Sequence, residues 1–245
     1  MARRYEAGES AIQVGRAFGF SAVAVCNYVR RSGGKVRSLS AAQRRYSLNE
    51  AAFSEITEQS AYWIGFLMAD GCINRGALTV ALAAVDAPHL DAFRAFLGTD
   101  RPITFENNST GKSAARVEVN SAKIVADLAR FGVVARKSNT AKVMGLAADR
   151  HFWRGVVDGD GWLGLINGKY PSLHLHGSLP LMEQFADFAR GAAPQAKILT
   201  KPHKSIFRVA LAGSTAAAVL SLLYPEAKVA LQRKAAIARQ MLAPY

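Results

Sequence analysis

The sequence has few cysteines and no long apolar run. Its only two cysteines, Cys26 and Cys72, have the spacing of neither a disulfide framework nor a metal-ligand motif, which favours a reducing intracellular compartment. No uninterrupted apolar stretch reaches the roughly 18 residues of a membrane span. The N-terminus, with Arg3 and Arg4 followed by polar residues, lacks the apolar segment of a signal peptide. These absences predict a soluble, cytoplasmic protein without a membrane partner.

Acidic residues are scarce relative to basic ones. The chain has 31 Lys and Arg against 18 Asp and Glu, which gives a formal net charge of +13. This excess favours a polyanionic partner such as nucleic acid, and a merely basic soluble protein is the alternative. Half of the 245 residues are hydrophobic, so the chain can build a real core, and its length suits one large domain or two modest ones.

Residues 1–35 predict a small helical unit. Ser10 and Ser21 are good N-caps for two helices that would run to Phe18 and to about Arg31, with a turn at Gly19 between them. The apolar residues expected to pack these helices across the turn are Ile12, Ala17, Phe20, Val25 and Val29.

This unit resembles the helix-turn-helix of site-specific recombinases and related regulators, although few residues precede Tyr5 to form a first helix. The resemblance implies that Asn27, Arg30 and Arg31 lie on or beside a DNA-recognition helix. A helical hairpin packed on the main body is the alternative. Residues 36–52 follow as a basic linker, which is either solvated or lies along phosphates.

Two apolar stretches of helix length share one pattern, and the rest of the chain is organised around them. They read AYWIGFLMADG from residue 61 and HFWRGVVDGDG from residue 151. Each carries small residues four apart on one helix face, Gly65 and Ala69 in the first and Gly155 and Gly159 in the second. Two such helices can bring their backbones unusually close, so these four residues predict a helix interface.

Each stretch ends in an aspartate followed by a glycine, Asp70-Gly71 and Asp160-Gly161. Both glycines are expected to end their helices in a left-handed conformation. The aspartates would then lie at helix C-termini, where the macrodipole disfavours a negative charge by about 0.3–1 kcal/mol. Because the close helices would also bring the two carboxylates together, a bound divalent cation would relieve both penalties, and the pattern predicts a metal site.

Both stretches resemble the LAGLIDADG motif of homing endonucleases, in the single-chain form with two motifs. In register, Gly65 and Gly155 match the first glycine of the motif. Asp70 and Asp160 match its final aspartate, which binds metal in the family.

The first copy departs from the motif at Met68, where the second keeps Asp158. That position is not a metal ligand in the family, so the departure has little consequence for the chemistry. The resemblance further implies that the backbone carbonyls of Ala69 and Gly159 bind metal. The residues that match the basic side chains near the family's cleavage centre are Lys137 and Lys234.

From about residue 53 the chain reads as a duplication, with residues 53–147 as the first copy and 148–245 as the second. After its motif the first copy predicts strands at 77–85, 103–106 and 115–120 and helices at 90–97 and 122–130. The second predicts strands at 172–176, 197–200 and 206–211 and helices at 181–190 and 214–223, with 201–204 as a loop. This pattern predicts an α+β fold of two pseudo-symmetric αββαββα repeats.

Apolar and polar residues alternate in several of these strands, which predicts one buried and one open face. Two such sheets side by side would form a basic saddle that fits the major groove of DNA. The residues expected to contact DNA there are Lys112, Arg116, Glu118, Asn120, His174, His176, Lys201, Lys204 and Arg208. His174 and His176 would alternatively form a zinc pair, although no third ligand has a suitable spacing.

The resemblance implies a site-specific, metal-dependent double-strand DNA endonuclease that acts in intron homing as a monomer with an internal pseudo-twofold axis. Hard oxygen ligands favour Mg²⁺ or a similar cation such as Mn²⁺. The implied catalytic residues are Asp70, Asp160, Lys137 and Lys234. Two alternatives stay open: a maturase-like or cleavage-inactive descendant that binds intron RNA, and a helix-turn-helix transcription regulator.

Overall fold

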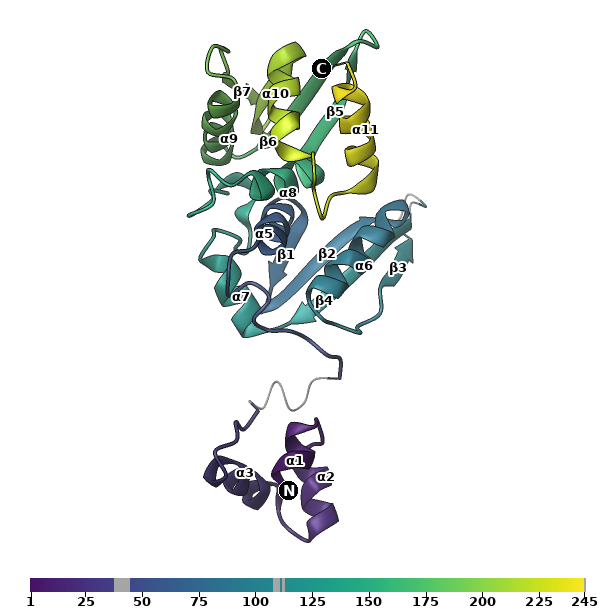
Figure 1. The fold of residues 1–245 in the computed structure, drawn as a ribbon, viewed down its shortest axis with the longest axis vertical. Coiled ribbons are helices and arrows are strands. Elements are labelled where there is room, and N and C mark those ends of the chain that lie inside the picture. Colours follow the sequence, from purple (N-terminus) through teal and green to yellow (C-terminus); the bar gives the residue numbers. More distant parts are fainter. Residues whose placement is uncertain (38–44, 108–110, 112, 245) are drawn as a thin grey trace. The chain divides into compact units, whose positions relative to one another are not determined.

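The computed structural model describes all residues except 38–44, 108–110, 112 and 245. The described chain forms two compact units, Met1–Tyr46 and Ser47–Tyr245 (Figure 1). Among the described residues, no helix combines the length and the apolar character needed to cross a membrane.

The first unit consists of three helices, α1 (Ala2–Glu6), α2 (Ala11–Phe18) and α3 (Ala22–Arg31). The predicted caps are present: the Ser10 hydroxyl accepts from the Gln13 N–H at 3.1 Å, and the Ser21 hydroxyl accepts from the Ala24 N–H at 3.1 Å. Helix α2 ends at Gly19, whose φ of 73° is left-handed. Local capping therefore determines both ends of the turn.

The core of this unit differs in part from the prediction. Val25 and Val29 are buried as expected, but Ile12, Ala17 and Phe20 are exposed. Val14 and Gly15 are the buried residues of α2, and because an α-helix turns by about 100° per residue, Ile12 lies on nearly the opposite side of α2 from Val14. The residues that form this small core are Tyr5, Val14, Val25 and Val29.

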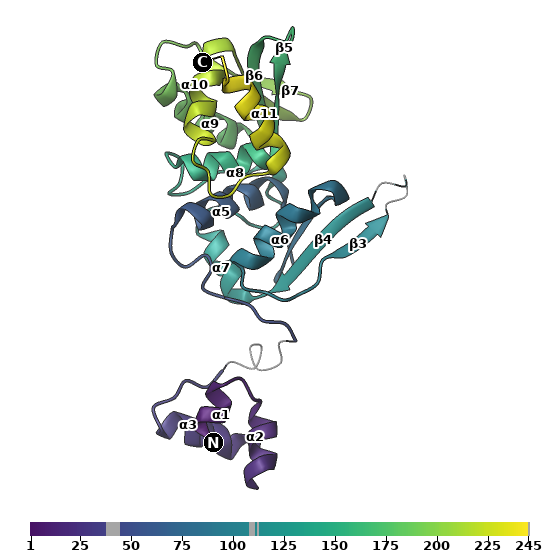
Figure 2. The ribbon, with the colours of Figure 1, turned by 45° about the vertical axis from the view of Figure 1, so that its right-hand side comes forward.

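The second unit contains two repeats of the same element order, as Figures 1 and 2 show. The first repeat consists of α5 (Glu58–Asp70), β1 (Gly71–Asn74), β2 (Ala77–Ala83), α6 (Ala87–Phe96), β3 (Thr104–Asn107), β4 (Ser113–Asn120) and α7 (Ala122–Ala129), with 3₁₀ turns at Ala84–Asp86 and Lys137–Asn139. The second consists of α8 (Arg150–Asp160), β5 (Gly161–Ile166), β6 (Tyr170–Gly177), α9 (Leu179–Ala192), β7 (Thr200–His203), β8 (Ile206–Ala212), α10 (Gly213–Leu223) and α11 (Gln232–Leu242).

Each repeat has one four-stranded antiparallel sheet, and the strand orders correspond: β1-β2-β4-β3 in the first and β5-β6-β8-β7 in the second. Helices cover one face of each sheet, and Figure 2 shows α6 lying along β4. Helices α5 and α8 pack against each other at the centre of the unit (Figure 1). The predicted α+β fold of two repeats is confirmed.

The central helices begin at side-chain caps. The Thr57 hydroxyl accepts from the Ser60 N–H at 3.1 Å to start α5. The Asp149 carboxylate starts α8 by accepting from the N–H groups of His151 at 2.7 Å and Phe152 at 2.9 Å. Both helices therefore begin at a defined residue.

The segment at 201–204, predicted as a loop, is mostly strand. Strand β7 includes Lys201, Pro202 and His203, and Pro202 pairs with Phe207 of β8. Proline lacks an N–H donor but is tolerated on an edge strand, which β7 is. The turn itself is narrower and includes Lys204, whose φ of 55° is left-handed.

Candidate active site and DNA interface

Helices α5 and α8 touch backbone to backbone at their small residues. A Cβ atom added to Gly65 would lie 1.9 Å from the carbonyl oxygen of Phe152, and one added to Gly155 would lie 2.1 Å from that of Tyr62. Neither position accepts a side chain while the helices keep this separation. A Cβ atom on Gly159 would lie 2.3 Å from that of Ala69. All four small residues singled out by their spacing thus lie at this contact.

The glycines that follow the aspartates are not left-handed, and that prediction is wrong. Gly71 has a φ of −75° and Gly161 a φ of −82°, so both have extended backbone and begin strands β1 and β5. Their function is steric: an added Cβ atom would lie 2.6 Å from the Leu67 carbonyl oxygen at the first and 2.4 Å from that of Val157 at the second. Glycine allows the chain to pass directly from helix to strand.

Asp70 and Asp160 are the last residues of α5 and α8. The absence of a side chain at Gly159 leaves room for the Asp70 carboxylate, because a Cβ atom on Gly159 would lie 3.1 Å from Asp70 Oδ2. Loss of hydration, and next the negative charge of Asp70, raise the pKa of Asp160 to about 6. Burial also raises the pKa of Asp70, although Lys234 and Lys137 act in the opposite direction. The four charged groups form one cluster.

Lys234 is almost completely buried, and its Nζ donates to the carbonyl oxygens of residues 157–159 at 2.7–3.1 Å. Its ammonium group thus satisfies the carbonyls at the C-terminal end of α8, where a positive charge is favoured. Burial lowers the pKa of Lys234 to about 8, and the negative charge of Asp158 opposes that shift. The Gly159 carbonyl, implied as a metal ligand, therefore already accepts a hydrogen bond from Lys234.

Lys137 is the pseudo-symmetric counterpart in the first repeat, but its contacts differ. Its Nζ donates to the carbonyl oxygen of Gly71, one residue beyond the end of α5. Burial lowers the pKa of Lys137, and the nearby charge of Asp160 opposes that shift. The two lysines are thus both buried beside the aspartates, with different hydrogen-bond acceptors.

Asp158 forms a buried network that the sequence analysis missed. Its Oδ1 accepts from the Tyr224 hydroxyl at 2.7 Å, and its Oδ2 accepts from the Tyr62 hydroxyl at 2.8 Å and the Leu231 N–H at 2.7 Å. The Tyr62 hydroxyl also lies 2.9 Å from Nε2 of His89, whose pKa burial lowers to about 4, so the ring is neutral. Because the Tyr62 proton goes to Asp158, Nε2 is the donor in this contact. The carboxylate of Asp158 therefore links both repeats to the first turn of α11.

Asp158→Ala should destabilise the protein by about 3 kcal/mol or more, because three buried donors would lose their acceptor. Tyr224→Phe removes one of these donors together with its bond, so we expect a loss of only about 1 kcal/mol. Urea denaturation followed by circular dichroism measures both. Equal losses in the two variants would contradict this account of the network.

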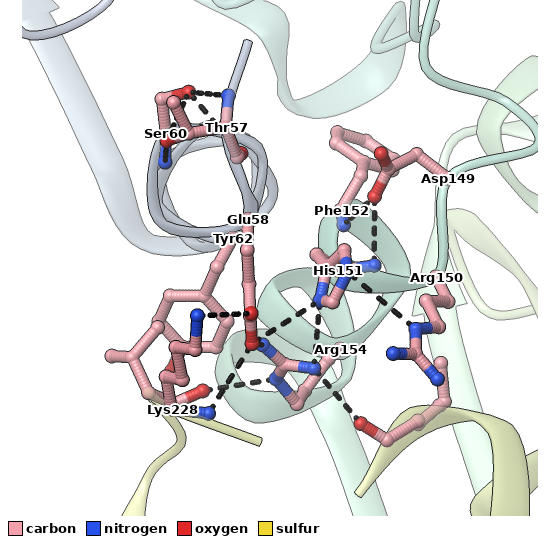
Figure 3. A network of polar contacts seen from close by, with 12 residues as sticks. Thr57, Glu58, Ser60, Tyr62, Asp149, Arg150, His151, Phe152, Arg154 and Lys228 are labelled. Carbon is pink, nitrogen blue, oxygen red and sulfur yellow. Dashed lines mark hydrogen bonds and ion pairs between the residues drawn. The ribbon is translucent and has the colours of Figure 1, made fainter. Parts of the chain in front are cut away.

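Arg154 is buried in a second network at the other end of α8 (Figure 3). Its guanidinium group donates to Glu58 Oε1 at 3.3 Å and to two backbone carbonyls at 2.9 and 3.1 Å. Glu58 also accepts from the Lys228 N–H at 3.2 Å and lies 3.6 Å from His151. The first motif has Ile64 at the position of Arg154. This network therefore joins the repeats asymmetrically.

The open face of the first sheet carries the predicted polar residues of β4. Val117 and Val119 are buried under the helices, whereas Arg116 and Glu118 are half-buried and Asn120 is exposed on the open side. Their predicted contact with DNA is sterically available. Lys112, also predicted to contact DNA, lies outside the described residues.

The open face of the second sheet carries a different set of polar side chains. His174, His176 and Arg208 are half-buried on its open face, and Lys201 and Lys204 are exposed. Two further side chains, which the sequence analysis did not single out, contact the two histidines of β6. Trp162, 49% exposed, has its ring centroid 5.0 Å from that of His174, and the His203 ring lies 4.9 Å from that of His176.

In the first unit, Asn27, Arg30 and Arg31 are all exposed on α3. The Arg30 guanidinium donates to the Asn27 side-chain oxygen at 3.1 Å. These three residues are available for a partner, as a recognition helix requires.

No group of three or more His, Cys, Asp or Glu side chains arranged to hold a metal occurs in the described part of the chain. His174 and His176 thus lack the third side-chain ligand of a zinc site there. A metal between Asp70 and Asp160 would have two carboxylates and would complete its shell with backbone carbonyls, water or substrate oxygens, as Mg²⁺ does.

Comparisons with known proteins identify the fold. No protein-family model matches the sequence, and no curated protein is significantly similar to it. Among solved structures, the LAGLIDADG meganuclease I-AabMI bound to uncleaved DNA is 11% identical, with a TM-score of 0.53 over 77% of this chain and 90% of that one. The homing endonuclease I-WcaI bound to its DNA recognition sequence is 16% identical, with a TM-score of 0.50 over 73% and 89%.

Full-length DUF199/WhiA from Thermatoga maritima is also similar, at 10% identity and a TM-score of 0.50 over 80% of this chain and 64% of that one. The neighbours thus comprise a DNA-bound LAGLIDADG meganuclease, a DNA-bound homing endonuclease and DUF199/WhiA. The chain has the LAGLIDADG fold in its two-repeat form, and the predicted resemblance is confirmed at the level of the fold.

Proposed function

We propose that the protein is a site-specific double-strand DNA endonuclease that hydrolyses phosphodiester bonds with a divalent cation. One observation carries this proposal. Asp70 and Asp160, 90 residues apart in the chain, are brought together at the ends of two helices in backbone contact. Two partly dehydrated carboxylates at one point cost free energy of folding, and such groups are typical of functional sites.

The residues present fit a hard divalent cation. Asp70 and Asp160 would hold Mg²⁺ or Mn²⁺, since carboxylate oxygens are preferred ligands. The cation would offset the loss of hydration and the charge of Asp70, which raise the Asp160 pKa in that order. The Ala69 and Gly159 carbonyls are further candidates. When bound, the cation supplies charge neutralisation at the phosphate and lowers the pKa of a bound water.

Lys137 and Lys234 would hold positive charge at their Nζ atoms beside the aspartates. Each is fixed by its hydrogen bonds to backbone carbonyls, so neither needs to reorganise when negative charge develops on a phosphate. Fixed donors in a partly dehydrated site stabilise such charge more strongly than mobile ones in water. Both lysines are thus proposed as catalytic residues.

The DNA would lie across the open faces of the two sheets, as the DNA-bound neighbours with this fold suggest. We assign contacts to Arg116, Glu118 and Asn120 on the first sheet. On the second we assign them to His174, His176, Lys201, Lys204 and Arg208. One chain carries both aspartates, so a monomer with an internal pseudo-twofold would suffice.

The first unit would add a second DNA contact through Asn27, Arg30 and Arg31 of α3. We therefore propose a division into a helix-turn-helix-like unit (1–35), a basic linker (36–52) and two repeats (53–147 and 148–245).

A DNA-binding protein without cleavage is the second candidate. It is favoured by the hydrogen bond from Lys234 to the Gly159 carbonyl, which occupies one implied metal ligand. Intron RNA would replace DNA as the partner of a maturase-like protein with the same saddle.

Incubation with a random-sequence DNA library and Mg²⁺, followed by sequencing of the ends produced, tests the proposal. A nuclease yields ends at one recurrent sequence that disappear when EDTA replaces Mg²⁺. Bound but intact DNA would overturn the endonuclease and favour the second candidate. Binding and splicing of intron RNA would favour a maturase.

A further inference from the structure

The open faces of the two sheets differ in charge. Strands β5 to β8, all of whose residues the structure describes, contain no Asp or Glu. The corresponding strands of the first repeat contain Glu106 on β3 and Glu118 on β4. Since the strand orders of the repeats correspond, the two sheets present unlike surfaces to a common ligand.

On the first sheet two arginines share one carboxylate. Arg116 donates to Glu118 Oε2 at 2.7 Å, and Arg101 approaches Glu118 Oε1 at 3.9 Å. The Thr79 hydroxyl donates to the same carboxylate at 3.3 Å. A phosphate approaching this face would therefore meet a carboxylate among its arginines, which weakens the attraction.

The second sheet instead gathers three of the five histidines of the chain. His174 and His176 lie on β6 and His203 on the edge strand β7, with the rings of His176 and His203 in contact. The register pairs His176 with Arg208, which in turn pairs with Lys201. The face is a cluster of cations and of imidazoles that become cations on protonation.

The surroundings of His174 and His176 favour the neutral forms of these two imidazoles in the free protein. Loss of hydration lowers the pKa of His174, and Arg208 adds to the shift. Loss of hydration also lowers the pKa of His176, with further contributions from His203 and Arg208. The other groups that face them are the Trp162 ring and the Ser172 hydroxyl, which is 3.2 Å from His174 Nε2. No carboxylate on the sheet opposes these effects.

We propose that the second sheet is the proton-sensitive half of the DNA interface, which takes up protons on His174 and His176 when phosphates dock on it. This inference rests on the proposed binding of DNA to the saddle. Phosphates would supply the negative charge that the sheet lacks, so bound DNA raises the histidine pKa values and, by thermodynamic reciprocity, protonation tightens binding. Affinity for DNA therefore rises as the pH falls through the histidine range.

The test measures binding of a fluorescein-labelled random-sequence duplex pool by anisotropy, in EDTA, from about pH 8 to about pH 5.5. The background is the full chain with Asp70→Asn and Asp160→Asn, because those carboxylates have raised pKa values and would add a pH effect of their own. The decisive comparison adds His174→Gln and His176→Gln to this background.

We expect binding to tighten on acidification in the background protein and to change little in the histidine variant. In the background protein, the slope of log affinity against log salt concentration should become steeper on acidification. The increase should be about 0.9 for each protonated histidine that contacts a phosphate. Arg116→Gln with Glu118→Gln, on the first sheet, is the matched control and should keep the pH effect.

The same pH effect in the histidine variant, or its loss in the first-sheet control, would overturn the inference while leaving DNA binding established. Failure of every protein to bind at any pH and low salt would overturn both the inference and the proposed DNA partner. The two failures are thus distinguishable without any measurement of cleavage.

Trp162 offers a second readout. It is exposed beside His174, whereas Trp63 and Trp153 are buried, so quenching of exposed tryptophan by a protonated imidazole reports on His174. The midpoint of this fluorescence titration should move to higher pH when DNA is added, by reciprocity with the binding. An unchanged midpoint would contradict proton uptake at this residue.

Discussion

Asp70→Asn and Asp160→Asn should each reduce double-strand cleavage at least about a hundredfold while DNA binding is kept. Asparagine preserves the shape of the side chain but removes a negative ligand, so the proposed cation would be held too weakly to assist hydrolysis. Neither variant should be less stable, because each removes one of two partly dehydrated carboxylates; loss of hydration, and next the charge of Asp70, raise the Asp160 pKa. Cleavage of a selected target and anisotropy with labelled DNA measure the two properties.

Asp187→Asn is the matched control for these variants, since Asp187 is an exposed aspartate of α9 that pairs only locally with Arg190. It should cleave like the unaltered protein. Unchanged cleavage in Asp70→Asn or Asp160→Asn would refute the assignment of these residues. Loss of DNA binding in either would instead indicate that the carboxylate supports the structure.

Gly65→Val should destabilise the protein by about 3 kcal/mol or more, because even its Cβ atom would lie 1.9 Å from the Phe152 carbonyl oxygen. The atom that it meets belongs to the backbone of α8, so relief requires the two central helices to separate. Gly155→Val meets the Tyr62 backbone in the same way and should have a similar effect. Urea denaturation measures both losses.

Gly191→Ala provides the control for these substitutions. Gly191 lies near the end of α9 with nothing within 4 Å of an added Cβ atom, so alanine should be neutral or stabilise the helix by up to about 1 kcal/mol. A stable Gly65→Val protein would mean that the helices can move apart. The aspartates would then not be held together, and the proposed metal site would lose its physical basis.

The central helix pair could be predicted from the sequence because its determinants are local and repeated. Small residues four apart and aspartates at equivalent positions each act within one helix. Their coincidence in two stretches indicated that the helices meet. The alternation of Val117 and Val119 with polar residues likewise identified the faces of β4.

The predictions that failed did so for separate reasons. The glycines after the aspartates were interpreted as left-handed because most helix-ending glycines are, whereas Gly71 and Gly161 are required by the nearby carbonyls of α5 and α8. Strand β1, only four residues long, has no apolar alternation of sufficient length to predict it. The network of Asp158 brings together α5, α8 and the segment between α10 and α11, and its only signal was the contrast with Met68.

The buried Arg154 makes the halves of the second unit non-interchangeable. Its guanidinium reaches across to Glu58 of the opposite half, while Asp158 reaches across to Tyr62. A homodimer of the second repeat alone would bury two arginines without Glu58 and two Asp158 carboxylates without Tyr62. A homodimer of the first would leave Tyr62 without that acceptor. Neither half is thus a self-sufficient building block, and an engineer who wishes to exchange one for a foreign half must carry these cross-repeat partners along with it.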